Sequence, residues 1–260
     1  MEKKTKSLLL ILLLATLAAR LVLAFLIPNF TYDSYFNLRQ VEHITEDFTP
    51  LYHDELSYGG RNLRFLPFFH YFIALFDLIL PLELAAKIIP NLLVASLTII
   101  IFFISKKITN NETASLYSAL IAGFLPLLFS TNSFAIETLF LPLLFLNLYA
   151  FLNLKNKKYF YLYIVTFLLL CLTSSATVLL LIGFGIYLLL LKIERKKIFR
   201  EELELILFSL FFFLWSQALF FKNLLLQEGI SFIWQNIPAD IILQYFPKMT
   251  LGQALISVSV

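Results

Sequence analysis

Long apolar runs dominate the sequence, and they restrict the chain to a fold in which helices cross a lipid bilayer. The 260 residues are 60% hydrophobic and 14% charged, with a mean hydropathy of +0.85. A helix needs about 20 mostly apolar residues to cross the hydrocarbon core, and inside lipid its backbone must bond to itself. We therefore expect an all-α polytopic membrane bundle with these spans: 7–27, 84–104, 114–130, 138–154, 159–174, 176–191 and 203–221.

Segment 67–80 is also apolar, but its length of about 14 residues is short for a crossing. Basic residues decide its path, because Lys and Arg collect in cytoplasmic loops. If the segment does not cross and the N-terminus is cytoplasmic, 13 Lys and Arg residues face the cytoplasm and five face outward. A crossing would reverse that count. We predict a re-entrant or interfacial helix on the outer side and a cytoplasmic N-terminus.

Other features of the chain narrow its class. The net charge of +3 comes from short basic tracts between spans, so it does not indicate nucleic-acid binding. Cys171 is the single cysteine, which rules out an intrachain disulfide. The last ten residues begin an apolar run too short to span. We expect one membrane domain over 1–260, with about seven full spans and a partial one, belonging to a longer protein.

The polar segment 28–66 follows the first span and forms the predicted first extracytoplasmic loop. It holds six of the 17 acidic residues, together with three arginines and two histidines. Charges next to membrane spans are retained where they pair, face water or do chemistry. This loop is therefore the candidate reaction site.

Two carboxylates stand out on this side of the membrane. Asp33 lies where the chain leaves the first span, at the start of a predicted helix over 34–47, and Glu137 opens the span 138–154. Asp33 is either a site carboxylate or a helix cap, in which Thr31 or Asp33 bonds the first turn. The sequence alone leaves both interpretations open.

The run Leu-Ser-Tyr-Gly-Gly-Arg at 56–61 indicates a turn followed by two arginines, Arg61 and Arg64. Two glycines allow a close backbone approach, and arginine forks match phosphate oxygens. The segment is either a phosphate-binding loop, which Lys222 could assist, or an ordinary turn with solvated arginines. The further polar candidates are Arg20, Arg39, His53, Tyr58 and His70.

Arg20 lies about 10 Å from the outer end of its helix, so it needs a partner or an aqueous cavity. His53, Asp54 and Glu55 either join a metal shell or form a solvated polar tract.

The order of these motifs resembles that of a known family. Arg20 late in the first helix precedes the Asp-Ser-Tyr-Phe-Asn-Leu-Arg run at 33–39 and the Gly-Gly-Arg turn. A short apolar segment and two spans then lead to Ser-Thr-Asn-Ser-Phe-Ala-Ile-Glu at 130–137. This order resembles the catalytic subunit of archaeal-type oligosaccharyltransferases, within the GT-C class of membrane glycosyltransferases.

The resemblance implies an enzyme that moves a sugar or oligosaccharide from a polyprenyl-phosphate or -diphosphate donor to an acceptor protein or glycan. It favours asparagine of a protein as the acceptor and places the reaction on the extracytoplasmic face. It implies that Asp33 and Glu137 are catalytic and bind a divalent cation, Mn²⁺ or Mg²⁺. It also implies residence in the plasma membrane of a prokaryote. Two departures stand out: Thr138 follows Glu137 where the family has a second carboxylate, and a WWDYG acceptor motif is absent.

Two other classes of protein fit the composition. A polyprenyl-lipid or small-solute transporter or flippase would often show paired repeats and spans broken near the midplane. The sequence shows no repeat, and its charge lies at one face instead of midway. A non-catalytic scaffold would use the outer loop for a partner, but it would not need opposed carboxylates at two span ends.

Overall fold

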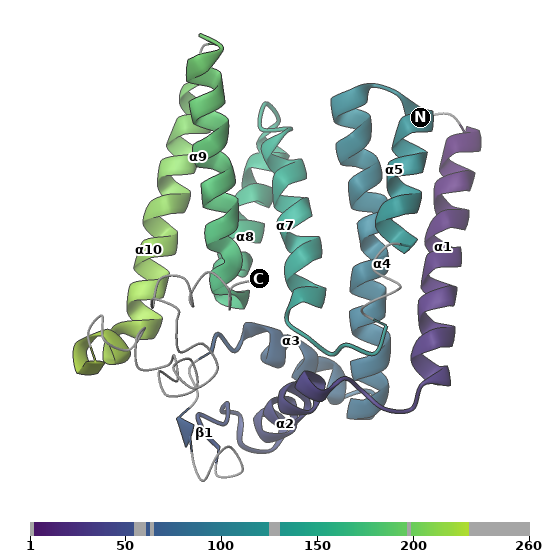
Figure 1. Cartoon of the computed structure of the whole chain (residues 1–260), viewed down its shortest axis with the longest axis vertical. Coiled ribbons are helices and arrows are strands. Elements are labelled where there is room, and N and C mark those ends of the chain that lie inside the picture. The colour runs from purple at the N-terminus through teal and green to yellow at the C-terminus, as the bar shows by residue number, and fades with distance from the viewer. Residues whose placement is uncertain (1–2, 55–60, 63–64, 125–130, 197–198, 229–260) are drawn as a thin grey trace, which may run out of the picture. The chain divides into compact units, whose positions relative to one another are not determined.

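The computed structural model describes residues 3–54, 61–62, 65–124, 131–196 and 199–228. The chain divides into two compact units, Met1–Ser216 and Gln217–Val260. The description below concerns the first unit, which holds nearly all of the elements. Its two ends are named the α2 end, where α2 and α3 lie, and the Lys3 end, where α1 begins (Figure 1).

The described residues are almost entirely helical, which confirms the all-α prediction. Their elements are α1 (Lys3–Leu26), α2 (Tyr32–Asp47), β1 (His53–Asp54), β2 (Arg61–Asn62), α3 (Phe68–Asp77), α4 (Leu82–Thr109), α5 (Glu112–Phe124), α7 (Glu137–Phe151), α8 (Lys157–Thr173), the short 3₁₀ helix η1 (Ser175–Thr177), α9 (Val178–Ile193) and α10 (Arg200–Glu228). The strands β1 and β2 pair antiparallel, with His53 opposite Asn62.

Four helical segments within the described ranges are long and apolar enough to cross a membrane: Lys3–Leu26, Leu82–Thr109, Ser175–Ile193 and Arg200–Lys222. They confirm an integral membrane protein, while the predicted number of seven full spans stays a prediction. Helices α5, α7 and α8 are shorter, with 13, 15 and 17 residues.

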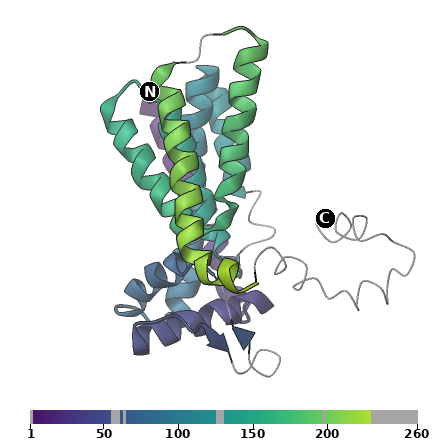
Figure 2. The same ribbon diagram turned by 90° about the vertical axis from the view of Figure 1, so that its left-hand side faces the viewer.

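Helix α3, with ten residues, lies beside α2 at one end of the bundle, and α4 begins at that same end (Figures 1 and 2). This arrangement agrees with the prediction that segment 67–80 does not cross.

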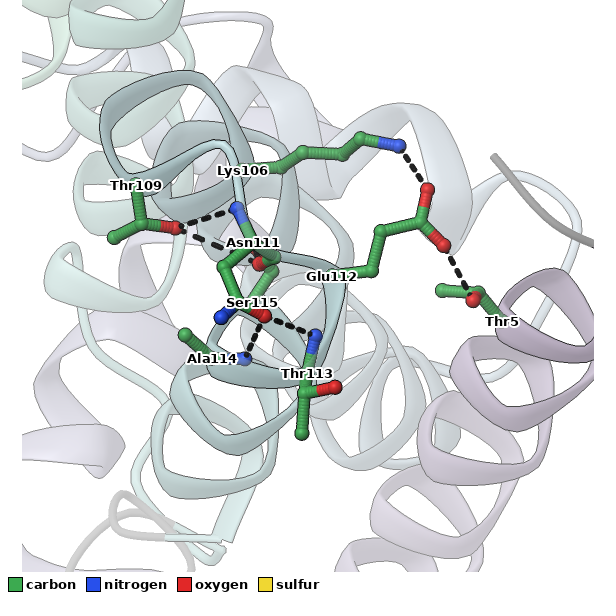
Figure 3. Close-up of polar contacts among 8 residues, drawn as sticks. All are labelled: Thr5, Lys106, Thr109, Asn111, Glu112, Thr113, Ala114 and Ser115. Atoms are coloured by element: carbon green, nitrogen blue, oxygen red, sulfur yellow. Dashed lines mark hydrogen bonds and ion pairs between the residues drawn. The ribbon is translucent and has the colours of Figure 1, made fainter.

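Helices α1, α4 and α5 pack through small residues. A Cβ atom on Gly123 of α5 would lie 2.6 Å from Thr16 Cγ2 of α1 and 2.6 Å from Thr98 Oγ1 of α4. Both threonines are buried. At the Lys3 end, Glu112 pairs with Lys106 of α4 and accepts a hydrogen bond from Thr5 of α1, as Figure 3 shows. One carboxylate therefore joins three helices.

Asn111 caps the start of α5 in the same region. Its side-chain Oδ1 accepts hydrogen bonds from the backbone N–H groups of Thr113 (2.9 Å) and Ala114 (3.2 Å), which is N-cap geometry (Figure 3).

Helices α7, α8, α9 and α10 enclose a second core. Its centre is aromatic: Tyr163, Phe167 and Phe184 are buried together. Hydrogen bonds inside it join helices. Asn147 Nδ2 of α7 donates to Tyr163 O of α8 at 2.9 Å. Tyr163 in turn shares a 2.6 Å hydrogen bond with Ser209 of α10.

A third core lies under α2 and α3. Val41 and Ile44 of α2 pack with Phe69 and Ile73 of α3 and with Phe134, which precedes α7. The helix predicted over 34–47 is confirmed, and its buried face carries Val41 and Ile44. These contacts hold α2 and α3 against the segment that leads into α7.

His70 anchors this junction through Asn37. Asn37 Nδ2 donates to the Phe134 carbonyl at 2.8 Å, which leaves its Oδ1 facing His70 Nε2 at 2.8 Å. Because that oxygen can only accept, His70 carries its proton on Nε2. The ring is fully buried, and burial lowers the pKa of His70 to about 4 from 6.5. The junction therefore contains a neutral imidazole.

We predict that the Gly123→Ala substitution destabilises the protein. The added methyl group would overlap two β-branched side chains that have little rotamer freedom, and overpacking of this kind costs about 1–3 kcal/mol. Thermal unfolding in detergent measures the loss. The matched control is Gly185→Ala in α9, where no atom lies within 4 Å of the new Cβ. Equal stabilities of the two variants would contradict the packing described.

We predict that acid weakens the α2–α3 junction through His70. The pKa of His70 is lower in the fold than in the unfolded chain, so its contribution is complete above about pH 6.5 and is lost as pH falls toward about 4. The stability lost between about pH 7.5 and pH 4.5 should be about 2–3 kcal/mol larger in the wild type than in His70→Gln. Glutamine retains an N–H donor but does not titrate. Parallel pH profiles for the two proteins would refute a neutral, buried imidazole.

Candidate functional site

The candidate site lies where the α1–α2 connection and the start of α2 meet the segment 131–136 that leads into α7. Thr31 N donates to Asn132 O at 3.2 Å, and Phe134 N donates to Ser34 Oγ at 2.8 Å. Asn132 Nδ2 donates to the carbonyls of Ile27 and Asn29, both at 3.3 Å. The segment before α7 is therefore bonded along the start of α2.

Asp33 lies in the first turn of α2 and is exposed. Helix α2 begins at Tyr32, so Asp33 is inside the helix and does not cap it. Thr31 occupies the N-cap position, but its hydroxyl contacts Ser34 Oγ at 2.7 Å and caps no backbone N–H. The capping interpretation of Asp33 is thus wrong. The carboxylate points to solvent at the positive end of the helix dipole.

Glu137 is the first residue of α7 and is also exposed. The next residue, Thr138, is buried and donates to Ala135 O at 2.7 Å, so it bonds locally. Two exposed carboxylates therefore begin two helices whose N-terminal turns are joined through residues 131–134. Within the described residues, no three His, Cys, Asp or Glu side chains converge as a metal-binding group.

Arg20 lies in the interior of the bundle and is connected through Asn91 to the segment 131–136. It is fully buried, and its Nε donates to Asn91 Oδ1 of α4 at 3.0 Å. The amide nitrogen of Asn91 donates to the carbonyls of Thr131 (2.9 Å) and Lys87 (2.7 Å). The predicted need for a partner is met by Asn91, which sequence reasoning missed. Arg20 and Asn91 connect α1 and α4 to the segment that positions Glu137.

Lys87 and Asn132 are further residues that the sequence did not single out for the site. Lys87 Nζ donates to Ile27 O at 3.1 Å and lies over the rings of Phe25 (5.6 Å) and Phe30 (5.5 Å). The sequence signal that could have identified Lys87 is its position within an apolar run. Both residues fix the end of α1, from which the chain enters α2.

Arg39 is occupied by an ion pair. Its two terminal nitrogens lie 2.9 and 3.3 Å from the carboxylate oxygens of Asp54, whose exposed fraction is 5%. The solvated interpretation of the 53–55 tract is therefore wrong for Asp54. The pair attaches β1 to α2, a structural role. His53, beside it in β1, is exposed and makes contacts of its own.

The predicted phosphate-binding residues stay predictions. Arg61 is in β2, but its side chain, Tyr58, Glu55 and Arg64 lie outside the described residues. Lys222 is exposed in α10 and belongs to the second unit. The geometry near Asp33 and Glu137 therefore rests on the first unit alone.

Comparison with known proteins identifies a family and a relative that this chain resembles. Residues 66–220, more than half of the chain, match the family model described as dolichyl-phosphate-mannose-protein mannosyltransferase. The matched range includes Glu137 and begins after α2. The chain is also 29% identical over 136 residues to dolichyl-phosphooligosaccharide-protein glycotransferase 2 of Archaeoglobus fulgidus, an alignment that covers 48% of this chain and 23% of that protein.

The chain spans less than a quarter of the length of that archaeal relative. Both matches agree with the GT-C resemblance drawn from the motif order. Given the extent of the family match, the chain belongs to the dolichyl-phosphate-mannose-protein mannosyltransferase family of membrane glycosyltransferases.

Proposed function

We propose that the protein transfers a sugar or oligosaccharide from a polyprenyl-phosphate or -diphosphate donor to an acceptor protein. One observation carries this proposal: Asp33 and Glu137 are exposed in the first turns of two helices that hydrogen bonds join at one membrane end. The family description and the name of the archaeal relative support the lipid-linked donor and the protein acceptor.

The reaction requires two things of the protein. The bond between the sugar and the donor phosphate breaks, so negative charge grows on the phosphate, while the acceptor nucleophile gives up a proton. An exposed carboxylate can accept or orient that proton. Asp33 is our proposed residue for this role, because it stands at the start of a helix held in place on two sides.

Asp33 and Glu137 also offer the hard oxygen ligands that Mg²⁺ or Mn²⁺ prefers. Two carboxylates fit such an ion only if donor phosphate oxygens or water complete its shell. When bound, the cation would neutralise charge on the leaving phosphate. The arginines of the first loop would add to this effect at the phosphate.

Asparagine is the acceptor we propose, on the resemblance to oligosaccharyltransferases. Thr138 stands where that family has a second carboxylate, and its hydroxyl is bonded to Ala135 O. The metal site of this chain would therefore draw one fewer ligand from α7. The alternative acceptor is a hydroxyl group of a protein or glycan. Transfer assays with asparagine and hydroxyl acceptors distinguish the two.

We also propose that the α2 end faces outside and the Lys3 end faces the cytoplasm. The Lys3 end carries basic residues in three turns, among them Lys106, Lys155 and Lys192, as the positive-inside rule requires. Donor and acceptor would then meet on the extracytoplasmic face.

Cysteine labelling checks this orientation. In a Cys171→Ser background, Tyr32→Cys, whose native side chain is 92% exposed, should react with an impermeant maleimide in intact cells. Glu194→Cys, exposed at the Lys3 end, should react only after permeabilisation. The reverse pattern would place the carboxylates in the cytoplasm and remove the proposed face of reaction.

Substitution of the carboxylates tests the chemistry. In the full-length protein, Asp33→Asn and Glu137→Gln should each lower transfer of labelled sugar from a polyprenyl-phosphate donor by about 10²–10⁴-fold. Chelation of Mg²⁺ and Mn²⁺ should lower it as well. The matched control is Glu83→Gln, an exposed carboxylate in the first turn of α4 at the same end. Undiminished activity of Asp33→Asn would remove Asp33 from the mechanism.

A further inference from the structure

Two adjoining cavities lie among α7, α9 and the start of α10 in the first unit, and none of their lining residues belongs to the candidate site. The apolar cavity, of about 520 Å³, lies between α7 and α9 and is lined chiefly by Leu144, Leu148, Leu179, Leu180, Gly183 and Phe184. The polar cavity, also about 520 Å³, is lined by Lys107, Asn153, Lys155, Asn156, Tyr159 and Glu201, among others. Phe151, Leu152 and Glu202 line both, so the two spaces adjoin.

The apolar cavity has the length of one bilayer leaflet. Leu144, Leu148 and Leu152 are spaced four residues apart and form one face of α7. Eight residues of helix extend about 12 Å, and half of the hydrocarbon core measures about 15 Å. The cavity therefore accommodates an ordinary acyl chain, whereas a polyprenyl chain is far longer.

The cavity is accessible from the lipid phase. No atom lies within 4 Å of a Cβ built on Gly183, and Leu179 on the same wall is exposed. The wall that α9 contributes is therefore open at Gly183. Where the apolar part ends, Tyr187 donates to Glu202 Oε2 at 3.0 Å and marks the boundary with the polar part.

The polar cavity carries charges of both signs. Lys107 and Lys155 come from the end of α4 and the α7–α8 turn, while Glu201 and Glu202 come from the first turn of α10. Lys106, the neighbour of Lys107, instead pairs with Glu112 (Figure 3). A phosphate suits the lysines and an ammonium group suits the glutamates. A head group with phosphate alone would face the carboxylates unpaired.

We propose that these cavities bind one aminophospholipid of the phosphatidylethanolamine type. Its acyl chain lies between α7 and α9, its phosphate contacts Lys107 and Lys155, and its ammonium group contacts Glu201 and Glu202. The head group lies where α4 ends and α10 begins, and none of the contacting residues belongs to the candidate site. This inference does not rest on the proposed glycosyl transfer.

Native mass spectrometry of the full chain in detergent tests the head group. Dioleoyl lipids with ethanolamine, choline and glycerol head groups are titrated in turn. The ethanolamine lipid should bind about 3- to 10-fold more tightly than the other two, because choline has no N–H donor and the glycerol lipid has no ammonium group. Equal affinities for all three would overturn the proposal and indicate unspecific lipid uptake.

Substitutions separate the chain site from the head-group site. Gly183→Leu should fill the apolar cavity and weaken binding of the ethanolamine lipid by about 10-fold. Gly185→Leu is its matched control, because Gly185 is equally open but does not line the cavity. Unchanged binding by Gly183→Leu would overturn the proposed chain position.

The lysine pair provides an independent test that does not depend on the packing of α9. Lys107→Gln with Lys155→Gln should weaken binding about 10-fold, whereas Lys157→Gln, exposed at the same end, should not. Glu201→Gln should abolish the preference for ethanolamine over glycerol lipid. If that preference survives Glu201→Gln, the assigned ammonium contact is wrong.

Discussion

The hydrogen bonds made by residues 131–134 are the constraint on which the rest of this arrangement depends. This non-helical backbone lies at the α2 end of the bundle, where backbone polar groups left without hydrogen bonds are costly. Thr131 O is bonded by Asn91, Asn132 O by Thr31, and Phe134 by Ser34 and Asn37. Because the bonding groups come from α2 and its N-terminal flank and from α4, the segment also fixes where α7 begins. The positions of both candidate carboxylates follow from it.

Buried polar side chains support the junction between residues 131–134 and α2 from the interior of the bundle. Arg20 bonds to Asn91, and His70 bonds to Asn37, so each cationic or titratable group acts through an amide. An amide can donate and accept at once, which lets it connect a side chain to a backbone carbonyl. The candidate site is consequently supported by groups that themselves do not reach solvent.

The family match favours a glycosyltransferase over the transporter and scaffold alternatives.

Much of the fold could be predicted from the sequence, because membrane helices leave strong one-dimensional signals. Apolar length indicated the spans, and the distribution of lysines indicated that segment 67–80 stays at one end. The contacts of the site could not be predicted in the same way. Arg20 demanded a partner, but Asn91 lies 71 residues later within an apolar run that reads as an ordinary span. Arg39 looked like a site residue, yet the β1 strand brings Asp54 to it. The roles of Asp33, Glu137 and a divalent cation stay predictions, since geometry places the groups without showing the reaction.

The long sequence separation between α2 and its partners has a consequence for how the protein is made. Ser34 and Phe134 are 100 residues apart, and Asn37 and Phe134 are 97 apart. At about 5–20 residues per second, the ribosome needs about 5–20 s to supply that stretch. During this interval α2 has already been synthesised, but it lacks the segment 131–134 to which its first turn is bonded. Synthesis of α4 and α5 therefore precedes the docking of α2 onto this segment, and any chaperone that binds the nascent chain in this interval meets α2 undocked.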